Sequence, residues 1–500
     1  MVGSKVRTLL VLGAMCFLAP FAMAETPRYL DYCCSEITPP PANYGRTGFK
    51  GVIVDPDSTD PACYQTISAA LRAVHSNGTI WVKPNNRKTL IENLVIRKPV
   101  KIKRYVKSDV AAAGGTRQCR TVPGLGKEYT DELQAEIAKL ERTKASIRDE
   151  EEIENFNEMI AGLQSDIENV NQFAFYRIQP VSGDYCARVS LKNWKGTVEI
   201  SGAKFVPPPV GEKRTKDCIV QTAGNLTVTG SSFSGASSSL FSGMANYRAI
   251  VINDGSATIV GNEIESLKTG IVVNHKPNIY DNKVSTTPAD RKILIADNWI
   301  TGTTENAIAV MAPVPTVIKN NKLIFSSGKA PVGRKAYAGI TTYGVGPICG
   351  NWIDSHPIGI VHYGSGEIRD NVVIENGTGI SLRIDNQKPD EKFRLYDNKI
   401  AGNRKVGLAT PRGAIQEHDA GYITALYEQG REEEIYKTQR GDSTYFNGNQ
   451  FCNRKNVFRM KDLPPGARRA NTFKGGRGWE RRCDIRPITF APPVCSATSY

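Results

Sequence analysis

The sequence predicts an all-β solenoid with an α-helical insertion, and three features of the chain carry this prediction. Two short phrases recur in a fixed order through its second half. A stretch of about 45 residues before them has apolar residues at helical spacing. The composition, with 40% hydrophobic and 23% charged residues, excludes wholesale disorder and a polytopic membrane protein.

The first 24 residues predict export. Lys5 and Arg7 precede an apolar run that ends at Ala22-Met23-Ala24, and we expect cleavage before Glu25. A membrane anchor is the alternative, but the run is shorter than the roughly 20 residues that span a bilayer, and Pro20 interrupts it. The mature chain is therefore expected in the periplasm, on the cell surface or outside the cell, with no transmembrane segment.

Charge and cysteine content narrow the expected partners. The chain has 64 Lys and Arg against 50 Asp and Glu, and loss of Lys5 and Arg7 with the leader leaves a net charge of +12. Such a surplus favours an acidic partner. The ten cysteines after the leader favour disulfides in an exported chain, and no Cys-x-x-Cys pair indicates a metal site. We expect neither a metal nor another cofactor.

The first recurring phrase is Gly, Asp or Asn, then Asn, with an apolar residue two places later. It occurs at Gly261-Asn262, Asp281-Asn282, Asp297-Asn298, Asn320-Asn321, Gly350-Asn351, Asp370-Asn371 and Asp397-Asn398, and in degenerate form at Gly230-Ser231. A small residue and an aliphatic one follow eight or nine residues later, at Gly270-Ile271, Ala307-Ile308, Gly359-Ile360, Gly379-Ile380 and Gly407-Leu408, and after an insertion at Gly339-Ile340. The phrases predict stacked coils of about 20 residues with two or three strands each.

The Asn column has a structural interpretation. Asn tolerates the left-handed backbone conformation of tight turns, and stacked Asn side chains can hydrogen-bond as a ladder along the axis. The interval from Asn282 to Asn298 is too short for a regular coil, and the pattern offers no explanation for it.

The residues before the repeats complete the fold prediction. A helical segment at 64–74 is followed by strand-like segments at 78–84, 92–96 and 98–102. This succession, with the Asn and Gly–Ile phrases, resembles the pectin-lyase-like superfamily over residues 49–110 and 183–412. The resemblance implies a right-handed parallel β-helix, whereas the function stays open because unrelated chemistries share that fold.

Residues 127–172 predict a helical hairpin that leaves the solenoid and returns to it. Their acidic surface is expected to be solvated, and a coiled coil that binds a partner protein is the alternative. The chain thus divides into a leader (1–24), a cap with the first coils (25–115), the helical insertion (116–182), the repeats (183–412), and a helix with a basic, Cys-containing tail (413–500).

One outward row is the predicted binding surface. Counting four residues from each Gly–Ile phrase reaches Tyr343, Tyr363 and Arg383, which should stack in neighbouring coils on the outside of one sheet. Aromatic faces beside a guanidinium suit an acidic polysaccharide. The alternative is that these side chains merely cover the sheet beneath a loop.

His362 stands one place earlier, in an inward column, and is expected to be a buried, hydrogen-bonded histidine. If the strand bulges there, His362 would join Tyr363, Arg383, Asp385 and Lys388 as a candidate acid–base and binding group. His356 and Asp354 lie near the same coils, without a spacing that defines a site.

The function prediction favours a non-catalytic protein of the cell envelope that binds an acidic polysaccharide. The signature phrases of pectate lyases, polygalacturonases and alginate epimerases are absent from the sequence. The alternative is a polysaccharide lyase or uronate epimerase, in which Tyr363 or His362 acts as base and Arg383 holds the carboxylate. The basic segment 454–486 suits an anionic polysaccharide or envelope surface, because export argues against nucleic acid, and a merely solubilising tail is the alternative.

A disulfide is predicted between Cys186 and Cys218, which open the strand segments of two successive coils. The rival pairing joins Cys119 to Cys186 and would tie together the two ends of the insertion.

Overall fold

The structure is a computed structural model. It describes residues 49–84, 89–106, 119, 125–147, 150–173, 175–181, 185–192, 195–206, 217–234, 247–265, 267–275, 291–325, 338–343, 346–363, 366–383, 393–410, 446–453, 455–457 and 470–475. The predicted leader (1–24) and the helix expected after Ile415 lie outside these residues.

Three parallel sheets make up the solenoid, and from Val74 to Ala409 each coil contributes one strand to each sheet in the order A, B, C. Sheet A contains β1 (Phe49–Val54), β2 (Val74–Val82), β5 (Val100–Arg104), β8 (Thr197–Ser201), β11 (Asn225–Thr229), β14 (Ser256–Val260), β17 (Ile293–Ala296), β20 (Thr316–Lys319), β23 (Pro347–Cys349), β26 (Gly366–Arg369), β29 (Phe393–Tyr396) and β32 (Phe446–Asn447).

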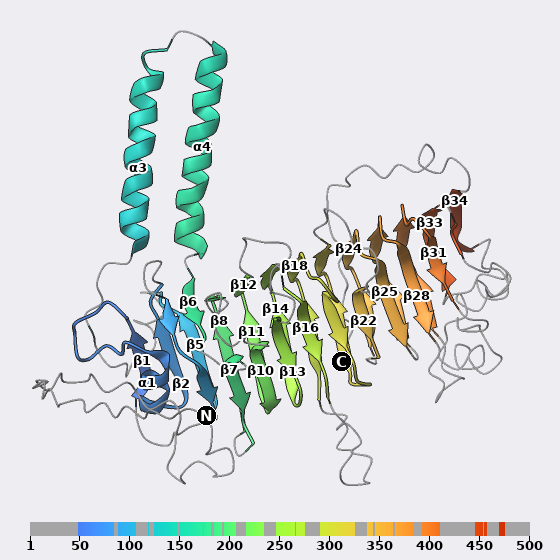
Figure 1. Cartoon of the computed structure of the whole chain (residues 1–500), viewed down its shortest axis with the longest axis horizontal. Helices are drawn as coiled ribbons and strands as arrows, with labels where there is room; N and C mark the ends of the chain where they lie inside the picture. Colours follow the sequence, from blue (N-terminus) through green and yellow to red (C-terminus); the bar gives the residue numbers. More distant parts are fainter. Residues whose placement is uncertain are drawn as a thin grey trace, which may run out of the picture. The chain divides into compact units, whose positions relative to one another are not determined.

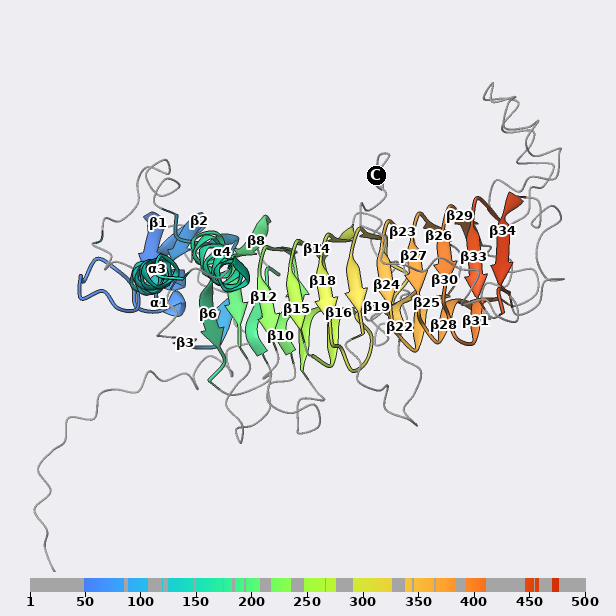
Figure 2. The ribbon, with the colours of Figure 1, turned by 90° about the horizontal axis from the view of Figure 1, so that it is seen from above.

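Sheet B contains β3 (Leu90–Ile91), β6 (Tyr176–Gln179), β9 (Ala203–Phe205), β12 (Ser232–Ser234), β15 (Glu263–Glu265), β18 (Trp299–Thr301), β21 (Lys322–Ile324), β24 (Trp352–Asp354), β27 (Val372–Ile374), β30 (Lys399–Ala401), β33 (Gln450–Asn453) and β34 (Thr472–Gly475). Sheet C contains β4 (Leu94–Ile96), β7 (Tyr185–Ser190), β10 (Asp217–Ala223), β13 (Arg248–Ile252), β16 (Thr269–Val273), β19 (Ile308–Val310), β22 (Ala338–Thr342), β25 (Ile358–Tyr363), β28 (Thr378–Arg383) and β31 (Val406–Ala409). The predicted parallel β-helix is confirmed (Figures 1 and 2).

The core is built from stacked aliphatic columns. The residues after the Gly–Ile phrase pair in register from coil to coil, and the column Ile271, Ile308, Ile340, Ile360 and Ile380 is completely buried. Because successive residues of a strand alternate inward and outward, this register fixes which side chains point out of the solenoid. On sheet C several outward side chains, including Val272, Val361 and Ser381, are nevertheless buried.

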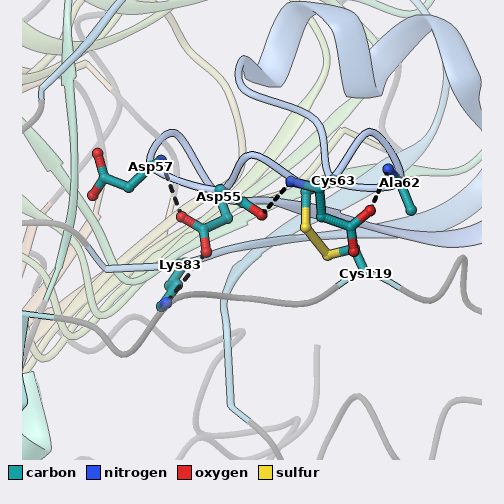
Figure 3. The surroundings of a disulfide bond; sticks show 8 residues. Asp55, Asp57, Ala62, Cys63, Lys83 and Cys119 are labelled. Carbon is teal, nitrogen blue, oxygen red and sulfur yellow. Dashed lines mark hydrogen bonds and ion pairs between the residues drawn. A yellow bond between two sulfur atoms is a disulfide. The ribbon is translucent and has the colours of Figure 1, made fainter.

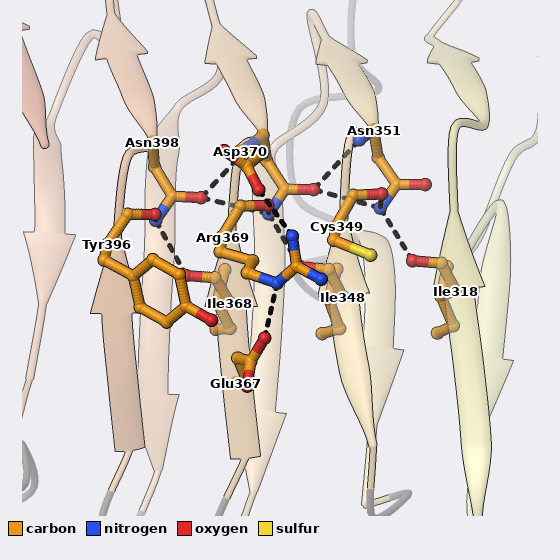
Figure 4. A network of polar contacts seen from close by, with 11 residues as sticks. Ile318, Ile348, Cys349, Asn351, Glu367, Ile368, Arg369, Asp370, Tyr396 and Asn398 are labelled. Carbon is orange, nitrogen blue, oxygen red and sulfur yellow. Dashed lines mark hydrogen bonds and ion pairs between the residues drawn. The ribbon is translucent and has the colours of Figure 1, made fainter. Parts of the chain in front are cut away.

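The Asn ladder lies in the turns from sheet A to sheet B and is buried (Figure 4). Each ladder residue bonds to the next, in the order Ser231, Asn262, Asn298, Asn321, Asn351, Asn371, Asn398, Asn449 and Asn471. The amide of Asn262 bonds directly to Asn298, so the ladder passes over Asn282, which lies outside the described residues. This explains the irregular interval, because the Asp281-Asn282 phrase does not mark a rung.

The turn geometry differs in one respect from the prediction. The left-handed residue is the one before each ladder residue, with φ between 51° and 66° at Gly230, Gly261, Asp297, Asn320, Gly350, Asp370, Asp397 and Gly448. This explains why Gly, Asp or Asn precedes the ladder residue, since these residues adopt that conformation most readily. The ladder Asn instead serves as a hydrogen-bonding side chain.

The helical hairpin is inserted in one turn from sheet A to sheet B. Helices α3 (Leu125–Lys144) and α4 (Glu150–Phe173) lie side by side between β5 and β6, with Leu140 and Ile160 buried (Figure 1). Strand β6 already pairs with β3 and β9, so the solenoid resumes at Tyr176 rather than at residue 183. At the other end, β32, β33 and β34 extend sheets A and B beyond the expected end at residue 412.

The first coil is closed by helix α1 (Ile67–Ala73) and by two buried ionisable side chains. The carboxylate of Glu92 accepts the backbone N–H groups of Ile67 and Ser68, each at 2.8 Å, which satisfies free donors at the helix start. The Nζ of Lys98 donates to the carbonyl oxygen of Val74 at 2.5 Å. Burial lowers the pKa of Lys98 to about 8.

A disulfide joins this end of the solenoid to the segment before α3 (Figure 3). Cys63 is bonded to Cys119, with Cα atoms 5.1 Å apart. Beside it, Lys83 and Asp55 form a buried ion pair at 3.2 Å. The rival pairing of Cys119 with Cys186 is therefore wrong.

Candidate functional site

The predicted outward row lies at the carboxyl end of three neighbouring strands of sheet C. Tyr363 pairs with Arg383, and Thr342 pairs with His362, which puts Tyr343 level with Tyr363. The two tyrosine rings stack with centroids 4.1 Å apart and planes at 5°. The rings are half-buried and Arg383 is exposed. We call Tyr343, Tyr363 and Arg383 the sheet C row.

Stacking changes what the sheet C row offers to a ligand. Each tyrosine turns one face toward the other ring, so that face is not available to a sugar. The Tyr363 hydroxyl and the exposed guanidinium of Arg383 remain as possible contacts. In the next coil toward the amino terminus, Met311 continues the row and is 48% exposed. Asp385 and Lys388 lie outside the described residues.

His362 points into the solenoid and is completely buried. Its Nδ1 lies 3.3 Å from the carbonyl oxygen of Thr342, and its ring packs edge-on against Phe393 at 5.1 Å. A Cβ at Gly366 would come within 2.0 Å of the His362 Nε2, so glycine is needed there. Strand β25 pairs with β28 without a bulge at His362. The acid–base role considered for His362 is therefore wrong, because a substrate on the outer face cannot reach its ring.

His356 is also buried, in the turn from sheet B to sheet C. Its backbone N–H donates to the Oδ1 of Asn376 at 2.9 Å, which makes it the first member of a second ladder through Asn376, Asn403 and Asn453. Burial lowers the pKa of His356 to about 3, so the ring is neutral at physiological pH. Asp354 accepts a hydrogen bond from the Ser355 hydroxyl at 2.8 Å. Neither residue joins the sheet C row.

Cys186 and Cys218 occupy equivalent positions in β7 and β10, as the neighbouring pair Ala187 and Ile219 shows. The predicted register is confirmed, but the predicted disulfide is absent, and both residues are free, buried thiols. The Sγ of Cys186 lies 3.0 Å from the Tyr247 hydroxyl. Burial raises the pKa of the Cys218 thiol well above its usual value. Cys349 and Cys452 each form a disulfide with another cysteine.

A second outward row, which the sequence analysis missed, runs along sheet B. The residue directly after each ladder Asn faces outward, and the paired positions are Glu263, Trp299, Lys322, Trp352, Val372, Lys399 and Gln450. Trp299 is 50% exposed, and the Lys322 Nζ lies 5.2 Å from its ring centroid. We call Trp299, Lys322 and Trp352 the sheet B row. The Asn phrase contained this signal, because it places one residue between two buried ones.

A charged network lies on the outer face of sheet A, next to the Asn ladder (Figure 4). Arg369 donates from Nε to Glu367 at 2.5 Å and from Nη1 to Asp370 at 2.7 Å. Burial, with the neighbouring Glu367, raises the pKa of Tyr396. The single guanidinium of this network is shared between two carboxylates, so it does not present a free cation to a ligand.

Within the described ranges, no group of three or more His, Cys, Asp or Glu side chains could hold a metal ion. In the same part of the chain, no helix has the length and apolar character needed to cross a membrane.

One family model matches the chain over residues 242–459, and its description is periplasmic copper-binding protein (NosD). No curated protein is significantly similar to the chain. The matched segment covers the coils with the continuous Asn ladder, and it agrees with the resemblance to the right-handed parallel β-helices of the pectin-lyase-like superfamily. The protein is an exported β-helix protein.

Proposed function

We propose that the protein binds an acidic polysaccharide of the cell envelope without transforming it. The observation that carries the proposal is the sheet C row, in which an exposed arginine continues a pair of stacked tyrosines on a rigid outer face. The ligand would lie across neighbouring coils, with its sugars beside the tyrosines.

Arg383 supplies the specificity for acid groups. A guanidinium binds a carboxylate through two parallel N–H donors, which gives strong, directional contacts. Tyr363 is the in-register neighbour of Arg383, so its hydroxyl can contact a sugar hydroxyl of the same ligand. The positive net charge of the chain would favour approach of a polyanion.

The buried histidines favour binding over catalysis. His356 and His362 are enclosed in the solenoid, and Tyr363 is then the remaining candidate base on the outer face of the described coils. The alternative, a lyase or uronate epimerase, would use Tyr363 as base and Arg383 as carboxylate holder. A lyase or epimerase would leave a chemically changed polysaccharide, whereas a binding protein would leave it unchanged. Analysis of the polysaccharide after incubation therefore distinguishes the two functions.

Copper binding, the property named by the matching family, finds no matching ligand set in the described coils. His275, His356 and His362 are buried, and no three-ligand group of His, Cys, Asp or Glu is present there. The free thiols of Cys186 and Cys218 are soft donors, but burial keeps Cys218 protonated, whereas a copper ligand is a thiolate. We therefore base the proposed function on the outer rows.

Two further contacts belong to this proposal. The segment 454–486 contains eleven Lys or Arg residues and three acidic ones, and it would add affinity for an anionic envelope surface. The helical hairpin would serve as a contact for a partner protein. Residues Ile153, Phe156 and Leu163 remain half-buried on its apolar stripe.

The test measures binding of the mature protein to polygalacturonate by calorimetry. Tyr363→Ala and Arg383→Ala should each weaken binding by about 1–3 kcal/mol while the melting temperature changes little, because neither side chain belongs to the core. Arg404→Ala is the matched control, since Arg404 is exposed in a different turn. Absence of binding to any acidic polysaccharide would overturn the proposal, and an unsaturated or epimerised product would replace it by the enzymatic alternative.

A further inference from the structure

The sheet B row combines aromatic and cationic side chains in strict alternation. Trp299, Lys322 and Trp352 come from the consecutive strands β18, β21 and β24, and each pairs in register with the next. Neighbouring strands of a sheet lie about 4.8 Å apart, so the two tryptophan Cα atoms are about 9.6 Å apart along the axis. This row is on a different sheet from Tyr363 and Arg383.

Exposure of the first tryptophan is unusual for a structural residue. Trp299 leaves half of its surface exposed, although it could bury more than most side chains. Trp352 and Lys322 are half-buried in the same row, and Ile324 lies beside them in the next outward column. That column also holds Thr301 and Asp354, so the face is partly apolar, with the Lys322 ammonium beside the Trp299 ring and a carboxylate near Trp352.

The spacing of the row fits an extended polysaccharide that runs parallel to the solenoid axis. One coil advances by about the length of one pyranose ring, so residues two coils apart meet alternate sugars of such a chain. Tryptophan rings bind the apolar faces of sugars, and their rigidity keeps the entropic cost of binding low. Lys322 would then stand opposite the sugar between the two stacked ones.

The charges limit the ligand further. Lys322 can pair with an acid group on the middle sugar, whereas the flanking tryptophans favour sugars without charge at the stacked face. The exposed Glu263 lies two coils from Lys322, where the next acid group of an alternating chain would fall, so its repulsion confines the site to one acidic sugar between two stacked ones. Along the axis the row therefore presents a repulsive carboxylate (Glu263), a stacking ring (Trp299), an attractive ammonium (Lys322) and a second stacking ring (Trp352).

We infer that Trp299, Lys322 and Trp352 form a second polysaccharide-binding site, selective for a three-sugar segment in which one acidic sugar lies between two uncharged ones. This inference rests on the proposed function for the class of ligand, an acidic polysaccharide, but it uses a separate surface. The carrying observation is the in-register alternation of two tryptophans around one lysine on an outer face.

The test compares three polymers by calorimetry with the mature, full-length protein. Hyaluronan fragments carry an acid group on alternate sugars, polygalacturonate fragments carry one on every sugar, and dextran fragments carry none. Trp299→Ala and Trp352→Ala should each lower the affinity for hyaluronan by about 5- to 100-fold. Lys322→Gln should remove most of the preference for hyaluronan over dextran.

Lys399→Gln is the matched control, because Lys399 stands in the same outward column without a tryptophan on either side. It should change hyaluronan affinity less than threefold. Quenching of tryptophan fluorescence by hyaluronan gives an independent readout, and it should fall in Trp299→Ala. Melting curves establish that each variant is folded.

The outcomes separate this inference from the proposed function. If both tryptophan variants bind hyaluronan like the wild type while Tyr363→Ala loses polygalacturonate, the sheet C site stands and the sheet B site is overturned. If neither acidic polymer binds the wild type, both fail. If the wild type self-associates and Trp299→Ala does not, the row is a contact between copies and the inference is overturned.

Discussion

Turns from sheet A to sheet B occur at the same place in every coil, yet two parts of the solenoid build them differently. From Gly230 onward, each described turn has two residues, a left-handed one and a ladder residue. Between β5 and β6, where the ladder has not begun, the same turn holds α3 and α4. The ladder side chain bonds to both neighbouring coils, so a longer turn there would break these bonds, whereas the turn between β5 and β6 has no ladder bond to lose.

The two parts also differ in how they satisfy buried backbone groups. In the ladder, Asn371 accepts from Asn351 and donates to Asn398 and to the carbonyl oxygens of Ile348 and Arg369. In the first coil, the ionisable side chains of Glu92 and Lys98 have this role. A neutral amide does not titrate, so its hydrogen bonds are the same at all pH values, whereas a buried lysine loses a proton as the pH rises through its pKa.

An insertion should have the largest effect where the ladder sets the turn. Six Gly and Ser residues placed between Asp370 and Asn371 should prevent cooperative folding, because the register of two ladder neighbours is lost. The same six residues between Thr286 and Thr287, in the turn from β16 to β17, should be tolerated, since loop length itself costs little. Circular dichroism melting curves compare the two proteins, and equal stability would contradict the special role of the ladder turn.

Removal of a single ladder side chain should have the next largest effect. Asn371→Ala removes the hydrogen bonds of the Asn371 side chain to the carbonyl oxygens of Ile348 and Arg369 and to the N–H of Asn351, and should lower the free energy of unfolding by about 3–5 kcal/mol. Urea unfolding measures this change. Asn320→Gly is the control, because glycine adopts the left-handed conformation of Asn320 before the ladder residue Asn321, and it should cost less than about 1 kcal/mol. A loss below about 1 kcal/mol in Asn371→Ala would show that water replaces the rung.

The first coil should show a pH dependence that the ladder lacks. The pKa of Lys98 is about 8 in the folded protein and near 10.5 when unfolded, so the unfolded chain binds more protons between these values. The free energy of unfolding should therefore rise with pH across this window, by at most about 3 kcal/mol from Lys98. Lys98→Met should remove this contribution. Parallel slopes for wild type and variant in urea unfolding from pH 7.5 to 10.5 would refute the assignment.

Removal of the helical hairpin should have the smallest effect on the solenoid. Replacement of residues 127–172 by a short Gly-Ser linker should change the free energy of unfolding of the solenoid by less than about 1 kcal/mol, because β5 and β6 have their own partners. Calorimetric melting measures this. Aggregation of the shortened protein would show that the hairpin is part of the core.

The sequence analysis predicted the sheet C row and missed the sheet B row, although the same local rule applies to both. Counting from the Gly–Ile phrase led to Tyr363 and Arg383, because alternation along a strand is strict once its register is known. The same rule applied to the Asn phrase gives Trp299 and Trp352. The last two rungs, Asn449 and Asn471, were missed although Gly448-Asn449-Gln450-Phe451 follows the phrase, because 51 residues separate Asn398 from Asn449 and hide the period.

By itself the sequence determined the fold class, the inward columns and the positions of the ladder from Asn298 to Asn398, because these follow from local turns and from a periodic core. The tertiary structure decided that the ladder skips Asn282, that the chain re-enters the solenoid at Tyr176, and that Cys63 rather than Cys186 bonds to Cys119. It also decided that His362 is enclosed while Trp299 is exposed. These features depend on contacts between residues far apart in the chain, which a pattern of neighbouring residues does not encode.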